Sequence, residues 1–152
     1  MEKILAIACD HGGYELKNAI IEHLKEQGIA YKDFGCYSTA SVNYPDYAKV
    51  LCASIQSGEC YRGILVCGTG IGMSIAANKH RGIRAACASD SFSVKYTRMH
   101  NDSNVLCLGG RVVGIGVGVE LADLFINTEF EGGRHQARVD MIADIEKSEA
   151  AK

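Results

Sequence analysis

Residues 63–72 read GILVCGTGIG, and this segment indicates the architecture more clearly than any other. Its first half, 63–67, is a short apolar run that predicts a buried strand. The glycines at 68, 70 and 72 predict a tight turn, because glycine adopts positive φ angles without steric cost. Apolar positions at helical spacing then continue to residue 79. A buried strand that turns directly into a helix is the repeating unit of a parallel α/β sheet.

The rest of the chain repeats this alternation of short apolar runs with longer amphipathic ones. We expect four more strands at 3–9, 30–34, 83–88 and 104–108. Further helices are expected at 14–27, 46–57, 91–99, 117–127 and 134–148. Because no linker, repeat or low-complexity stretch interrupts the pattern, it predicts one three-layer, Rossmann-like α/β domain over residues 1–152, with a five-stranded parallel sheet. The glycine-rich stretch 114–118 defines its helix start poorly.

Composition excludes several classes of protein. The chain has 152 residues, 47% hydrophobic and 22% charged, which is typical of a globular domain. No apolar run approaches the ~20 residues of a membrane span, and the N-terminal run resembles a strand more than a signal peptide. A formal net charge of −2 gives no electrostatic case for nucleic acid. The seven cysteines are odd in number and lack a CxxC pair, so we expect reduced, mostly buried thiols and a cytoplasmic location.

Polar and glycine residues follow the expected strands at the edge where a parallel sheet binds ligands. Ligands in open α/β sheets lie beyond the carboxyl ends of the strands. The segments that follow four of the expected strands are Asp10–Gly13, Cys67–Gly72, Ser89–Asp90 and Gly109–Arg111. The sequence therefore predicts a site at this edge, although turns after strands are often polar in any case.

Cys67 occupies the most informative position in that edge. The glycine turn and the helix start after it would aim backbone N–H groups at an anion or a developing oxyanion. A thiol placed there is favoured to ionise and could act as a base or nucleophile. A buried structural cysteine before a tight turn fits the same position, and position alone does not separate the two interpretations.

Three well-known uses of a glycine-rich turn do not fit. A dinucleotide fingerprint needs GxGxxG after the first strand, whereas GxGxG follows the third, and Asp33 fits a loop carboxylate better than a ribose-binding acid. The phosphate-binding pattern GxxxxGK[ST] is absent. A cysteine phosphatase loop needs Arg six residues after the thiol, where this chain has Met73. Attack of Cys67 on phosphorus is therefore disfavoured.

Candidate phosphate and proton-transfer groups lie farther along the chain. Arg134 and Arg138 are four residues apart on an expected helix, so they could fork around a phosphate, and Arg111 strengthens that interpretation. A solvated basic face explains the same spacing. His100 is expected in a loop, where it could act as an acid or base or could simply be exposed, and His11 carries the same alternatives. HExxH, CxxC pairs and closely spaced His/carboxylate ligands are absent, so we predict no metal site.

Together these motifs resemble the type B ribose-5-phosphate isomerases and the related family that includes the galactose-6-phosphate isomerase subunits. The combination of CGTGIG, a later HND and a late GGRH is specific, although none of the three is so alone. The matching segments run in order through nearly the whole chain: Ala8–Gly13, Asn43–Ala48, Cys67–Lys79, Gly82–Ala86, Arg98–Leu106 and Glu131–His135. Residues 113–118 are richer in glycine than the resemblance leads us to expect.

The resemblance implies a Rossmann-like homodimer, or a dimer of dimers, with active sites shared between subunits. It implies interconversion of D-ribose 5-phosphate and D-ribulose 5-phosphate through an enediolate, without metal or cofactor. Cys67 would remove the C2 proton and return it at C1, Thr69 would assist proton movement, and His100 would open the furanose ring with help from Asp10. The implied substrate-binding residues are Asp10, His11, Tyr44, Gly68, Thr69, Gly70, Ile71, Gly72, Asn101, Arg111, Arg134 and Arg138.

Two other functions stay open on the sequence alone. An isomerase of a six-carbon sugar phosphate, such as allose 6-phosphate or galactose 6-phosphate, would use the same residues with a deeper pocket. A non-catalytic sugar-phosphate-binding subunit is a different class, and the presence of both Cys67 and His100 disfavours it.

Overall fold

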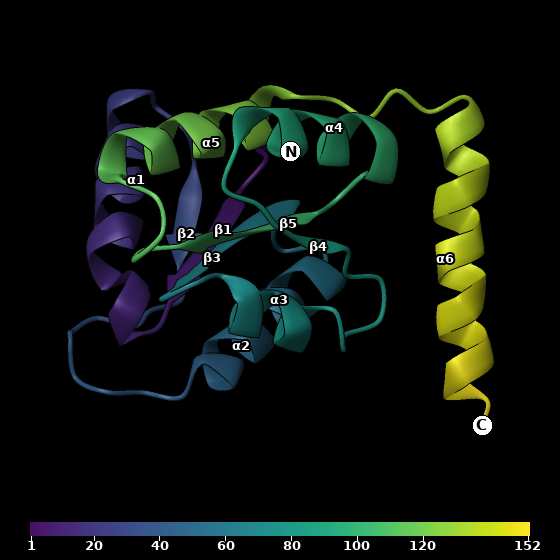
Figure 1. Ribbon diagram of the computed structural model, residues 1–152, viewed down its shortest axis with the longest axis horizontal. Helices are drawn as coiled ribbons and strands as arrows, with labels where there is room; N and C mark the ends of the chain where they lie inside the picture. Colours follow the sequence, from purple (N-terminus) through teal and green to yellow (C-terminus); the bar gives the residue numbers. More distant parts are fainter.

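The computed structural model describes residues 1–152 and contains one five-stranded parallel sheet (Figure 1). The strand order is β2-β1-β3-β5-β4, which confirms the expected α/β architecture. The strands are β1 (Leu5–Cys9), β2 (Tyr31–Asp33), β3 (Arg62–Cys67), β4 (Ala85–Cys87) and β5 (Val105–Gly109). The three central strands are buried along their whole length, whereas the edge strands β2 and β4 are short and partly exposed. Burial on both faces explains why the central strands are continuous apolar runs.

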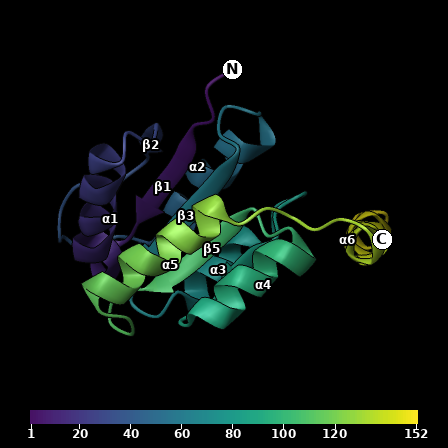
Figure 2. The same ribbon diagram turned by 90° about the horizontal axis from the view of Figure 1, so that it is seen from above.

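Helices cover both faces of the sheet, as Figures 1 and 2 show. One face carries α1, α4 and α5, and the other carries α2 and α3, each packed over its own buried apolar cluster. The helices are α1 (Tyr14–Glu26), α2 (Tyr44–Gln56), α3 (Ile71–Ala77), α4 (Ser91–Asn101), α5 (Ile115–Asn127) and α6 (Arg134–Ala150), with a short 3-10 turn at His11–Gly13. None of the helices is both long and apolar enough to cross a lipid bilayer.

The helix bounds lie within two residues of those expected, and the differences at α4 and α5 affect the site and the packing. α4 continues to Asn101, so His100 lies in its last turn and not in a loop. α5 begins at Ile115 despite the glycines, and Gly118 within it lets α1 approach closely. A Cβ on Gly118 would lie 2.5 Å from Leu16 Cδ1. The glycine that weakens the helix signal in the sequence is therefore a packing requirement between α1 and α5.

α6 stands apart from the layers and covers neither face of the sheet (Figures 1 and 2). The expected three layers are formed by the sheet and the other helices. Exposed Met141, Ile142 and Ile145 lie along α6, and a groove of about 840 Å³ is lined by both the helix and residues of the body. One tether is the carboxylate of Glu146, which accepts a hydrogen bond from the Gly82 N–H. α6 thus buries Val139 and His135 but keeps several apolar side chains exposed.

Candidate active site

The turns after β1 and β3 meet at the point where the strand order reverses. β1 lies between β2 and β3, so the chain first adds β2 on one side of β1 and then adds β3 on its other side. Such a switch point is where open α/β sheets bind ligands. The two turns contact each other through their glycines: a Cβ on Gly12 would lie 3.1 Å from the Gly68 nitrogen. The site therefore has a floor made of backbone.

The turn after β5 completes this floor. Gly110 N–H donates to the Cys67 carbonyl oxygen at 2.7 Å, and a Cβ on Gly110 would lie 2.6 Å from the Gly12 carbonyl oxygen. A Cβ on Gly13 would lie 2.3 Å from the Val66 carbonyl oxygen. Any side chain at these positions would force the three turns apart, and the glycines are therefore structural requirements of the site.

Cys67 ends β3 at this floor and is 4% exposed. Its Sγ accepts a hydrogen bond from the Gly70 N–H at 3.1 Å. Gly70 holds φ at +80°, and a Cβ there would lie 2.9 Å from the Leu108 carbonyl carbon. The sharp turn that directs this amide at the sulfur is thus accessible only to glycine.

Other buried thiols have different surroundings. Burial raises the pKa of Cys52 to about 12, and it raises the pKa of Cys107 as well. The pKa of Cys9 is also raised to about 12, mainly by burial, although the positive charge of Lys17 opposes the shift. These three cysteines remain neutral thiols near neutral pH.

Asp10 and His11 line the β1 side of the floor. Asp10 is buried, and its Oδ1 accepts hydrogen bonds from the N–H groups of Gly12 at 2.9 Å and Gly13 at 3.1 Å. His11 Nδ1 accepts a hydrogen bond from the Val42 N–H at 3.2 Å. In the neutral imidazole the proton is therefore on Nε2, which leaves a donor for a substrate oxygen.

The edge of this backbone floor is lined by Tyr44, Thr69 and Arg111. A Cβ on Gly72 would lie 2.8 Å from the Tyr44 ring, and one on Gly68 would lie 3.6 Å from Arg111 Nη1. Thr69 is exposed, and its Oγ1 accepts from the Ile71 N–H at 3.2 Å. The structure thus brings most of the expected site residues to one edge: Asp10, His11, Tyr44, Cys67, Gly68, Thr69, Gly70, Ile71, Gly72 and Arg111.

The remaining expected site residues lie at the other end of the sheet. Cys67 pairs in register with Gly109, the last residue of β5, whereas His100 and Asn101 end the helix that leads into the first residue of β5. Arg134 and Arg138 belong to α6, which lies on the side from which β5 starts (Figure 1). A single chain therefore contains two separated groups of site residues.

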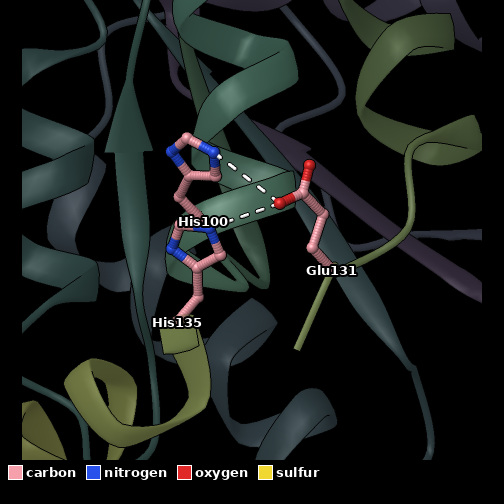
Figure 3. Close-up of side chains that lie close together, drawn as sticks. All are labelled: His100, Glu131 and His135. Atoms are coloured by element: carbon pink, nitrogen blue, oxygen red, sulfur yellow. Dashed lines mark ion pairs between the residues drawn. The ribbon is translucent and has the colours of Figure 1, made fainter. Parts of the chain in front are cut away.

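His100 takes part in a cluster that the sequence did not reveal. Its ring stacks on His135, with centroids 4.0 Å apart and planes inclined by 13°. Both Nε2 atoms approach the same Oε2 of Glu131, at 3.9 Å from His100 and 3.2 Å from His135 (Figure 3). His135 is buried, and desolvation together with His100 lowers its pKa, so it is neutral near pH 7. The GGRH motif contains His135, but nothing in the sequence placed it beside α4.

Asp33, at the end of β2, forms a structural ion pair. The buried Lys17 ammonium lies 2.8 Å from Asp33 Oδ1 and donates to the Cys36 carbonyl oxygen at 2.8 Å. This pairing agrees with a structural carboxylate and not with a ribose-binding acid.

Comparisons with known proteins show which family the chain belongs to. A family model described as Ribose/Galactose Isomerase matches residues 5–142. The chain belongs to this family. Members of the ribose/galactose isomerase family are isomerases, and so is this chain. Ribose-5-phosphate isomerase B of Escherichia coli (strain K12) is 46% identical over 145 residues, which cover 95% of this chain and 97% of that protein.

Solved structures of family members have the same fold. Ribose-5-phosphate isomerase B of Clostridium thermocellum superposes with a TM-score of 0.94 at 48% identity, covering 95% of this chain and 98% of that one. The Mycoplasma genitalium enzyme, solved with bound ribulose-5-phosphate, has a TM-score of 0.91 at 39% identity and covers 97% of this chain and 98% of its own.

Proposed function

We propose that this protein interconverts D-ribose 5-phosphate and D-ribulose 5-phosphate through an enediolate, with Cys67 as the base. The observation that carries the proposal is the Cys67 Sγ at the switch point, held 3.1 Å from the Gly70 amide beside a floor made of backbone. Relatives named ribose-5-phosphate isomerase B, one of them with ribulose-5-phosphate bound, support the five-carbon substrate.

The reaction needs a base that removes a proton from carbon and hydrogen-bond donors that stabilise the negative charge that develops on oxygen. The Cys67 thiolate removes the C2 proton of the open-chain aldose and returns a proton at C1 to give the ketose. The negative charge moves to the C1 oxygen, where turn amides between Gly68 and Gly72 stabilise it. Each such donor typically contributes about 3–4 kcal/mol of transition-state stabilisation. Thr69 and Asp10 face the sugar oxygens and assist proton movement between them.

The substrate's phosphate and its ring need the second group of residues. His100 opens the furanose by proton transfer at the ring oxygen, and Asn101 binds the sugar. Arg111 and His11 hold the phosphate from one edge, and Arg134 with Arg138 would complete its cradle. Binding energy from the distal phosphate then fixes C1 and C2 against the base.

The separation of the two groups leads us to propose a homodimer with shared active sites. Cys67 and His100 lie at opposite ends of β5, so one chain cannot bring both to one sugar. A two-fold arrangement would place the His100 end of one copy over the Cys67 edge of the other, and it would do so twice. The exposed apolar residues of α6 supply surface for such a contact.

The decisive assay measures isomerisation of D-ribose 5-phosphate, D-allose 6-phosphate and D-galactose 6-phosphate by the purified protein after EDTA treatment. We expect a clear preference for the five-carbon substrate, undiminished by EDTA. Activity only on a six-carbon substrate would keep the site and overturn the substrate. Activity on none of the three would favour a sugar-phosphate-binding subunit.

A further inference from the structure

Three potential metal ligands converge beside α4, outside the backbone floor that surrounds Cys67. The ligand atoms of His100, Glu131 and His135 all lie within 4.8 Å of one another (Figure 3). A tetrahedral zinc ion bound at about 2.0–2.1 Å separates its ligand atoms by about 3.3 Å. The observed distances to Glu131 Oε2, 3.2 and 3.9 Å, are therefore close to those that such an ion requires.

Backbone hydrogen bonds hold the segment that carries Glu131 and His135 in place. The Glu131 N–H donates to the Met99 carbonyl oxygen at 3.1 Å, which ties the segment before α6 to the last turn of α4. The His135 N–H donates to the Gly132 carbonyl oxygen at 3.0 Å. Only side-chain adjustment is needed to bring the three ligand atoms together.

His135 provides a second observation that points to a ligand. Its side chain is 7% exposed, and its Nε2 is a buried polar atom with no hydrogen-bond partner. Glu131 lies nearby, but the contact does not satisfy hydrogen-bond geometry. A buried, unsatisfied nitrogen is costly, and a bound ion would satisfy it.

We propose that His100, Glu131 and His135 bind a divalent transition-metal ion of the zinc class, and that this ion inhibits the isomerase. Two imidazoles and a carboxylate are a common zinc ligand set, with a fourth position left for water. The rings are stacked, so their lone pairs are parallel, and binding requires His100 to swing until its Nε2 faces the ion. His100 makes no hydrogen bond that opposes this movement, and its side chain is 35% exposed.

The inhibition rests on the proposed role of His100, whereas the metal binding does not. Coordination of Nε2 to a cation removes the lone pair that would accept a proton during ring opening. The ion is thus an inhibitor, and a chelator restores activity. Metal binding and inhibition are measured separately, so binding can be established even where inhibition fails.

Binding is best measured with Co²⁺, whose spectrum reports its ligands, and confirmed by Zn²⁺ competition. We expect one Co²⁺ per chain, visible bands of a four- or five-coordinate ion, and no ultraviolet thiolate charge-transfer band. Glu131→Gln and His135→Asn should each weaken binding by about 10–100-fold or more. The matched control is His23→Asn, because His23 pairs with Asp123 at 2.8 Å without a third ligand. That variant should bind Co²⁺ normally.

Thiolate charge transfer, or unchanged binding in Glu131→Gln, would overturn the site and assign the metal to cysteines. Absence of binding by the native protein would also overturn it. For the inhibition, Zn²⁺ should suppress ribose 5-phosphate turnover in native protein and not in Glu131→Gln. Normal metal binding without suppression would overturn the inhibitory role and leave the metal site. Absence of turnover in the metal-free native protein would instead be a failure of the proposed isomerase function.

Discussion

The Sγ of Cys67 and the backbone amide of Gly70 are 3.1 Å apart, and the amide donates toward the sulfur. Because Gly70 makes this contact at a positive φ of 80°, the position of the donor is set by the backbone and not by a neighbouring side chain.

Replacement of Cys67 by Ala should abolish isomerisation while substrate affinity is retained. The variant removes the proposed base but leaves the backbone floor and the proposed phosphate-binding residues. Turnover by stopped assay and binding by calorimetry test the two parts. Cys52→Ala, which removes a buried thiol from the core, should keep its turnover. Substantial turnover by Cys67→Ala would remove the cysteine from the mechanism.

Replacement of His100 by Ala should affect cyclic substrates selectively. Ribose 5-phosphate must open before C2 can be deprotonated, and the variant lacks the group that assists this step. D-Erythrose 4-phosphate cannot close a furanose ring, because its 4-oxygen carries the phosphate, so its isomerisation should fall much less. Equal losses on both sugars, measured as kcat/KM, would argue against the ring-opening role.

Mixing two inactive variants tests whether active sites are shared between chains. A dimer of one Cys67→Ala chain and one His100→Ala chain has one intact site if each site draws Cys67 from one copy and His100 from the other. Random reassembly of an equal mixture should recover about a quarter of native activity. If both residues acted within one chain, every site in the mixed dimer would carry one defect, and the mixture would stay inactive.

Gly70→Ala should destabilise the protein more than Gly58→Ala. Both glycines have nearly the same φ, +80° and +81°, so both variants have the strain of a left-handed alanine, about 1–2 kcal/mol. Nothing lies within 4 Å of a Cβ on Gly58, whereas one on Gly70 meets the Leu108 backbone at 2.9 Å. The clash should add about 1–3 kcal/mol. Chemical denaturation measures the difference, and equal losses would contradict the close contact.

Asp33→Asn should lower the free energy of unfolding by about 3 kcal/mol, because it leaves the buried Lys17 ammonium without its counter-charge. The double variant with Lys17→Met should be more stable than Asp33→Asn, since no buried charge remains. Breaking the exposed Lys25–Glu22 pair with Glu22→Gln is the control and should cost less than about 1 kcal/mol. Similar losses in the two single variants would contradict a strong buried pair.

Much of the fold followed from local patterns, and the differences came from tertiary packing. Apolar runs indicated the central strands, because burial on both faces selects them residue by residue. The start of α5 was placed too late, since the sequence does not show that Gly118 faces Leu16. The position of α6 depends on surfaces distant in the chain, which helical spacing alone does not encode.

The candidate site was predictable to a similar extent. Cys67, Asp10 and the glycine turns follow strands, so parallel-sheet topology was sufficient to bring them together. The stacking of His100 on His135 was not predictable, because it depends on how residues 131–135 lie against α4. The sequence predicts no metal site, and it does not show that His100 lies beside Glu131 and His135, because His100 is distant from them in the chain.

The glycine contacts among the three turns have a consequence for how such a site can change. Gly12, Gly68 and Gly110 hold the ends of β1, β3 and β5 together with no side chain between them. A shift in one turn must displace the other two, so the floor behaves as one stiff body. New specificity must therefore come from the walls, where Tyr44 and Arg111 stand, and a change of sugar length can leave the proton-transfer chemistry untouched.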